Sequence, residues 1–85
     1  MQWLHYRQSM PLIQRFFKCA IYINTRDHNP PHFHIRMSDG REAWVDIASL
    51  EILYGSVHRR EVKDALEWAA SNKEFLLKTF KEHNQ

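Results

Sequence analysis

Three histidines lie within one eight-residue stretch of the chain, Asp27-His28-Asn29-Pro30-Pro31-His32-Phe33-His34. His32 and His34 are two residues apart, so on a β-strand their imidazoles project from the same face. Imidazole nitrogens with a nearby carboxylate are ligands that zinc, iron, nickel and copper accept. The stretch therefore predicts a divalent transition-metal site, with zinc or nickel as the candidate ions, formed by His28, His32 and His34.

The same histidines also allow chemistry without a metal. Two neighbouring imidazoles can act as general base and general acid, and an arginine can stabilise charge developing on a phosphate. Together these groups suffice to cleave RNA through its own 2′-hydroxyl. This interpretation makes His32, His34, Arg59 and Arg60 the catalytic residues. A third interpretation is structural, in which the imidazoles hold the double-proline loop and Asp27 is only a turn residue.

The last two histidines of the stretch belong to a predicted β-hairpin. The segments His32–Met37 and Arg41–Ile47 alternate between apolar and polar residues. A three-residue connection, Ser38–Gly40, keeps the apolar residues of both strands on one face and puts Gly40 in the left-handed position. The register then predicts three pairs on the polar face: Arg36 with Glu42, His34 with Trp44, and His32 with Asp46.

Trp44, Asp46 and Arg36 are the candidate binding residues beside the histidines. Trp44 falls on the polar face by alternation, and an exposed tryptophan often marks a binding surface. The alternative is that the N-terminal segment around Trp3 covers it.

The remaining elements complete an α+β fold. Ile13–Ile23 is the predicted first strand and Glu51–Tyr54 a short fourth one. Arg59–Ala70 has the apolar stripe of a helix, and the capping-box spacing of Ser71–Glu74 predicts a break before a second helix. We expect a four-stranded, mainly antiparallel sheet in the order β-β-β-β-α-α, with the C-terminal helices packed on one face.

Length and charge limit the classes of function. The 85 residues make one domain, expected over residues 10–85, with residues 1–9 as an N-terminal extension. The net charge is +2, and residues 1–57 and 58–85 each hold six Lys/Arg against five Asp/Glu. The chain is therefore not a general nucleic-acid binder, although a local basic patch that contacts RNA stays open.

Cysteine usage and hydropathy indicate where the protein works. Cys19 is the single cysteine, which excludes an internal disulfide and fits a reducing compartment. No apolar run approaches the roughly 20 residues of a membrane helix, and the N-terminus has no signal-peptide pattern. A cytoplasmic protein without membrane contact is the expectation.

From Met10 onward the chain has a set of short motifs that occur together in one known family: Met10-Pro11, Arg15-Phe16-Phe17, the whole Asp27–His34 run, Val45-Asp46-Ile47, Arg59-Arg60 and Glu67-Trp68-Ala69. In these motifs the chain resembles a family of small bacterial proteins, domain of unknown function 4160. It implies a toxin–antitoxin component that acts with a small cognate partner protein. This sequence departs from the family pattern at Leu50, where glycine is usual, and at His58, where proline often precedes the arginine pair.

The leading prediction is therefore a toxin–antitoxin protein, with histidine-based ribonuclease activity if it is the toxin. The first alternative is a metal-binding protein or metalloenzyme that uses the three histidines. The second is a non-catalytic interaction module, such as the antitoxin. Each of these allows a homo-oligomer.

Overall fold

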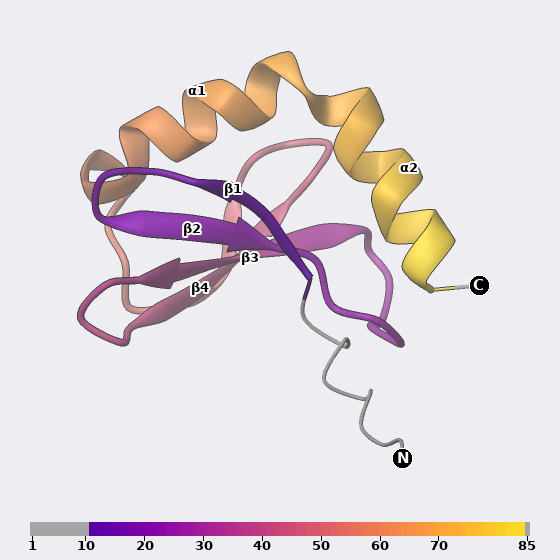
Figure 1. The fold of residues 1–85 in the computed structure, drawn as a ribbon, viewed down its shortest axis with the longest axis horizontal. Helices are drawn as coiled ribbons and strands as arrows, with labels where there is room; N and C mark the ends of the chain where they lie inside the picture. Colours follow the sequence, from indigo (N-terminus) through magenta and orange to yellow (C-terminus); the bar gives the residue numbers. More distant parts are fainter. Residues whose placement is uncertain (1–10, 85) are drawn as a thin grey trace.

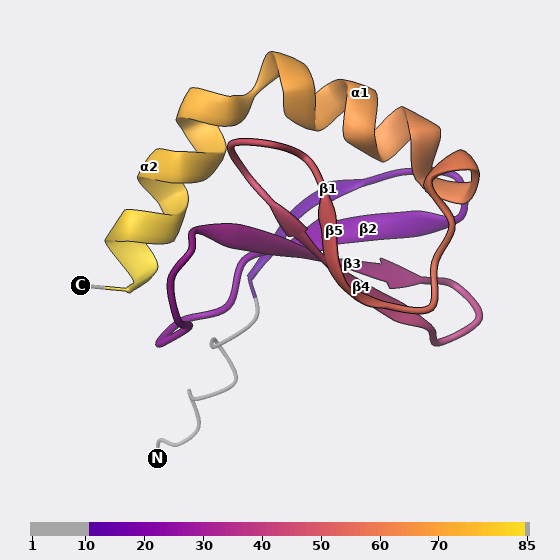
Figure 2. The same cartoon turned by 180° about the vertical axis from the view of Figure 1, so that it is seen from behind.

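The computed structural model describes residues 11–84, which form an α+β fold with five strands and two helices (Figures 1 and 2). All strands pair antiparallel with their neighbours in chain order, β1-β2-β3-β4-β5. The strands are β1 Leu12–Arg15, β2 Cys19–Tyr22, β3 His32–Met37, β4 Glu42–Asp46 and β5 Ile52–Gly55. A 3₁₀ turn, η2 Arg59–Val62, precedes α1 Lys63–Ser71 and α2 Lys73–His83. The predicted extension, residues 1–9, lies outside the described residues.

The fold class is as predicted, but the strand count is five rather than four. The segment expected to be one strand, Ile13–Ile23, is a hairpin of β1 and β2 closed by a turn in which the Phe16 amide donates to the Cys19 carbonyl at 2.8 Å. The turn contains no glycine, proline or asparagine, and Phe17 within it is 89% exposed. The residues of the turn favour strands, so strand propensity alone could not predict that the chain bends there.

The hairpin of β3 and β4 has the predicted register. His32 pairs with Asp46, His34 with Trp44, and Arg36 with Glu42. Gly40 has φ 99°, the left-handed conformation expected at the end of the three-residue connection. The register fixes both faces of the sheet, so the histidines and Trp44 share the face opposite the main core.

The other face of the sheet carries the core, which the helices cover (Figure 1). Phe33, Ile35 and Val45 are fully buried there. The helical segment adds a further set of buried side chains, with Val62 from η2 and the others from α1 and α2: Ala65, Leu66, Ala69, Leu76 and Phe80. This packing is the main source of stability for a short chain, and it holds β3 in a fixed position.

The helix boundaries differ from the prediction in their caps. The predicted break is present at Asn72, but Ser71 remains inside α1 and does not cap α2. At the start of η2 the cap is His58, whose Nδ1 accepts a hydrogen bond from the Arg60 amide. His58 can take this capping role because its ring nitrogen is a suitable acceptor.

Two glycines provide a test of the sheet. Gly55 has φ 116°, and a Cβ there would lie 2.2 Å from the Glu42 carbonyl oxygen, whereas a Cβ on Gly40 would meet nothing within 4 Å. We expect Gly40→Ala to lower the free energy of unfolding by about 1–2 kcal/mol through backbone strain alone. Gly55→Ala should cost more, because β5 must also move away from β4. Urea unfolding measures both; an equal loss would contradict the register of β5.

The ion pair between Arg41 and Glu61 predicts a pH dependence. Two guanidinium hydrogen bonds of 2.6 and 3.1 Å from Arg41, with one of 2.9 Å from the His58 amide, lower the pKa of Glu61 from 4.5 to about 2. The stabilisation is therefore present at neutral pH and lost as pH falls from 4.5 toward 2. Glu61→Gln should lower the thermal midpoint at pH 7, and this difference should shrink across that range. Glu67→Gln, another exposed glutamate, is the control.

Candidate metal centre

His32 and His34 are buried beneath the loop that precedes them. Their exposed fractions are 4% and 3%, although both lie on the sheet face away from the core. The loop over residues 24–31 returns to this face and brings Asp27 against both rings. The Oδ2 atom of Asp27 lies 3.0 Å from His32 Nε2 and 2.8 Å from His34 Nε2. One carboxylate oxygen thus bridges the two Nε2 atoms.

The outer ring nitrogens also have partners. His32 Nδ1 lies 2.8 Å from the Pro30 carbonyl oxygen, and His34 Nδ1 lies 2.8 Å from Glu42 Oε2. Trp44 Nε1 donates to the same Glu42 oxygen at 3.2 Å. These contacts fix the orientation of each ring with its Nε2 toward Asp27.

All four ring nitrogens face groups that accept hydrogen bonds. His32 Nδ1 must carry a proton, because the Pro30 carbonyl can only accept. His34 lies between two carboxylates, and a neutral imidazole can donate to only one of them. If both carboxylates are ionised, every ring nitrogen can therefore have a hydrogen-bond partner only when each of the two imidazoles carries two N–H protons.

His32 Nε2 is the atom that this arrangement satisfies least. Its distance to Asp27 is short, yet it has no hydrogen-bond partner, and the side chain is only 5% exposed. A buried polar atom left in this state costs about 1–3 kcal/mol. It lies beside a carboxylate and a second imidazole, in a group of three residues that could hold a metal ion.

A divalent ion fits this set with neutral imidazoles. One nitrogen from each of His32 and His34 and one oxygen of Asp27 all lie within 4.8 Å of one another. Tetrahedral zinc bonds of about 2.0–2.2 Å put ligand atoms about 3.3–3.6 Å apart, so the separations between the ligand atoms need to change by about 1 Å. The two charges of the ion replace the two additional protons. Both Nδ1–H groups then donate to a carbonyl or a carboxylate, the usual outer partners of metal-binding histidines.

The predicted metal ligand His28 is not part of this group. Its side chain is exposed, and its printed contact with Asp27 is made by its backbone amide, 3.3 Å from Oδ1. Asp27 takes the third position because the loop turns its carboxylate, rather than the next side chain, toward the sheet. Among the described residues, the group whose ligand atoms lie close enough together to hold a metal ion is Asp27, His32 and His34.

Asp27 is held in place by the C-terminal end of α2. Its backbone amide donates to the Asn84 side-chain oxygen, and the Asn84 amide group donates to the carbonyls of Asn24 and Phe80 at 3.1 and 2.9 Å. The Arg26 amide donates to the His83 carbonyl at 3.3 Å. The loop that carries the carboxylate is therefore fastened at its base, which limits the cost of ordering Asp27.

The predicted binding residues have separate positions on this face. Trp44 packs against both histidines, with ring centroids 5.5 Å from His32 and 5.2 Å from His34, and it is partly buried. Asp46 pairs with His32 as predicted, but its carboxylate accepts the Ala48 amide of the following turn at 3.0 Å. Arg36 is exposed, with its guanidinium 5.2 Å from the ring centroid of Tyr22.

The structure does not bring Arg59 and Arg60 to the histidines. Both side chains are exposed at η2, and Arg59 donates to the Leu50 carbonyl at 2.8 Å. Figures 1 and 2 show η2 at one end of the sheet and the loop over residues 24–31 at the other. Arg59 and Arg60 follow β5, at the end of the sheet away from the histidines. The sequence alone did not reveal this separation between the arginines and the histidines.

Comparison with known proteins supports the family resemblance. The model of the family described as Domain of unknown function (DUF4160) matches residues 17–81, most of the chain and the whole candidate centre. The chain belongs to the DUF4160 family. No curated protein and no solved structure showed significant similarity to this DUF4160 protein. Among its described residues, no helix is both long and apolar enough to cross a lipid bilayer.

Glu42, which contacts His34 and Trp44, provides a direct test of the candidate centre. Partial burial acts to raise the pKa of Glu42, but hydrogen bonds from His34 and Trp44 and the charge of Arg36 hold it below its ordinary value. We expect Glu42→Gln to lower the free energy of unfolding by about 1 kcal/mol, since a neutral acceptor replaces a charged one.

The indole N–H of Trp44 reports the same substitution. A carboxylate acceptor shifts the resonance of a donated proton downfield. When Glu42→Gln replaces the carboxylate with a neutral amide, the Trp44 indole resonance in a ¹H–¹⁵N spectrum should therefore move upfield. The Trp68 indole, which makes ring contacts with Phe16 and Phe75, should stay in place. An unchanged Trp44 resonance would show that this hydrogen bond is not formed in solution.

Proposed function

We propose that this DUF4160 protein binds a divalent transition metal through Asp27, His32 and His34. The observation that carries the proposal is the buried Nε2 of His32, without a hydrogen-bond partner and facing a carboxylate shared with a second imidazole. The ion would join the loop over residues 24–31 to β3. Metal binding then contributes to folding, because the unfolded chain does not hold the three ligands together.

Two nitrogens and one carboxylate oxygen accept zinc, iron, nickel or copper. Three protein ligands leave at least one position of a four-coordinate ion for water or a small ligand. Burial of both imidazoles makes a role in fixing the loop the first expectation.

Burial also bears on the choice between metal binding and ribonuclease activity. A general base and a general acid must reach the 2′-hydroxyl and the leaving oxygen of RNA. His32 and His34 are almost fully covered, and the arginine pair lies at the other end of the sheet. These observations favour a metal ligand role for the pair. The toxin–antitoxin role and the small partner protein remain predictions, and the proposed metal site is compatible with both.

Metal titration of matched variants tests the proposal. We expect the purified protein to bind Zn²⁺ with one ion per chain by isothermal titration calorimetry. Loss of one inner ligand in Asp27→Asn or His32→Gln should weaken affinity by more than about 100-fold. His28→Ala removes an exposed neighbouring imidazole and should leave the affinity within about twofold.

Thermal unfolding gives a second measurement for variants with low stability. Zinc at 100 times its dissociation constant stabilises the native state by about 2.7 kcal/mol, so it should raise the midpoint of the wild type and of His28→Ala. Asp27→Asn should show no such increase. Absence of zinc, nickel, iron and copper binding by the wild type would reject the proposal, as would an equal loss of affinity in His28→Ala.

A further inference from the structure

Two buried side-chain atoms among the described residues have no hydrogen-bond partner. One is Nε2 of His32, and the other is Oδ1 of Asn24. Buried polar atoms are nearly always paired in folded proteins, so each of these atoms points to a partner of another kind. An amide oxygen has two lone pairs and can only accept, so the partner of Asn24 Oδ1 must be a hydrogen-bond donor or a cation.

Asn24 lies close to the strand position that faces the histidines. It follows β2 and comes two residues after Tyr22, which pairs with His34. The side chain of Ile23 is buried in the core. Because side chains alternate along an extended chain, Asn24 projects to the opposite face, which carries the histidines.

The Asn84 side chain ties Asn24 to Asp27. Its amide group donates to the Asn24 carbonyl at 3.1 Å, and its oxygen accepts the hydrogen bond of the Asp27 amide. The backbones of Asn24 and Asp27 therefore both lie within hydrogen-bond distance of one short side chain. The unpartnered oxygen thus belongs to a residue held in the same corner as the proposed metal ligands.

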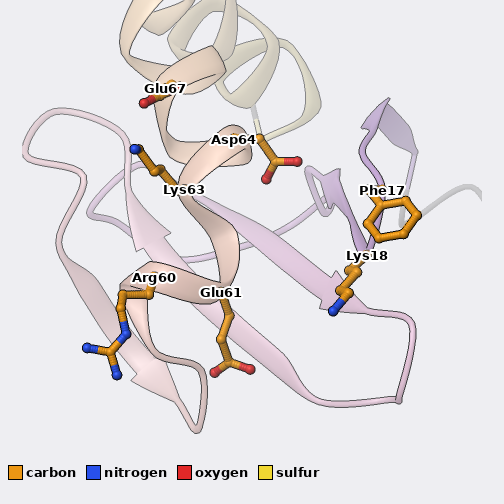
Figure 3. A pocket seen from close by; sticks show the side chains of 7 residues that line it. All are labelled: Phe17, Lys18, Arg60, Glu61, Lys63, Asp64 and Glu67. Atoms are coloured by element: carbon orange, nitrogen blue, oxygen red, sulfur yellow. The ribbon is translucent and has the colours of Figure 1, made fainter.

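Carboxylates elsewhere in the structure are arranged differently. Three of them line a surface pocket of about 390 Å³ near the start of the helical segment: Glu61, Asp64 and Glu67. Figure 3 shows these carboxylates pointing in different directions, with the cations of Lys18, Arg60 and Lys63 among them. Within residues 11–84, only the group of Asp27, His32 and His34 brings histidine and carboxylate atoms close enough to hold an ion.

We propose that Asn24 Oδ1 is the fourth ligand of an ion held by Asp27, His32 and His34. This inference rests on the proposed function and deepens it, since it decides whether the centre is open or closed. A neutral amide oxygen takes the position that three protein ligands leave on a four-coordinate ion, and it adds no charge. The centre then has no position for water, as in structural rather than catalytic zinc sites. The ion joins the end of β2 to the loop and to β3.

Zinc titration of variants at position 24 measures the contribution of this ligand. Asn24→Ala should weaken binding by about tenfold or more in isothermal titration calorimetry. The variant keeps the backbone carbonyl that accepts from Asn84, so the loop should stay fastened. Asn24→Asp restores an oxygen at the same place, and it should bind zinc at least as tightly as the wild type. A side chain that only packs against the loop would not give this recovery.

Two matched variants serve as controls for the titration. Asn29→Ala removes an exposed amide from the same loop, and Glu67→Gln removes a carboxylate from the surface pocket of Figure 3. Both should bind zinc within about twofold of the wild type.

Cobalt in place of zinc shows whether a coordination position is open. Azide binds an ion only at a position that is free or held by an exchangeable ligand such as water. We expect azide to leave the visible spectrum of the Co²⁺-loaded wild type unchanged and to alter that of Asn24→Ala. The wild-type measurement needs no variant, so it tests the inference even if Asn24→Ala fails to fold.

Three results would overturn the role of Asn24 while leaving the metal site in place. They are equal zinc affinity of the wild type and Asn24→Ala, an equal loss of affinity in Asn29→Ala, and an azide-induced spectral change in the wild type. Absence of metal binding by the wild type is a different outcome, because it rejects the proposed function itself and this inference with it.

Discussion

The contact of one Asp27 oxygen with two imidazole nitrogens is the interaction on which the rest of this face depends. It covers two histidines that strand alternation would otherwise leave on the surface. It also sets both rings with their outer nitrogens toward Pro30 and Glu42. Trp44 packs on the rings so fixed, and Tyr54 packs on Trp44. The aromatic side chains on this side of the sheet are thus arranged around the candidate centre.

The sequence was sufficient for those parts of the structure that local patterns determine. The β3–β4 register followed from alternation and one glycine, because a shift by one residue would have put Phe33 in solvent and His34 in the core. The break before α2 was also predicted, although its cap was not. The unusual Leu50, noted where the family has glycine, has φ 62°, the conformation in which glycine is least strained.

Features that depend on long-range folding could not be predicted. The position of Asp27 depends on the hydrogen bond that its backbone amide donates to the Asn84 side chain, 57 residues away, which no local pattern contains. The turn after Phe16 consists of residues that favour strands, so strand propensity predicted one long strand where the structure has two. Arg59 and Arg60 were grouped with the histidines by chemical type alone, whereas the meander puts them at the other end of the sheet.

Because Asn84 holds Asp27, the opening of the last turn of α2 and the positioning of the Asp27 carboxylate are coupled equilibria. If the last turn of α2 opens, Asp27 loses its tether, and an ion that requires Asp27 must in turn disfavour that opening by the same free energy. Backbone amides near the C-terminus would therefore exchange more slowly with solvent deuterium when the centre is occupied. The end of α2 would then respond to occupancy of the centre through the hydrogen bond between the Asp27 amide and Asn84.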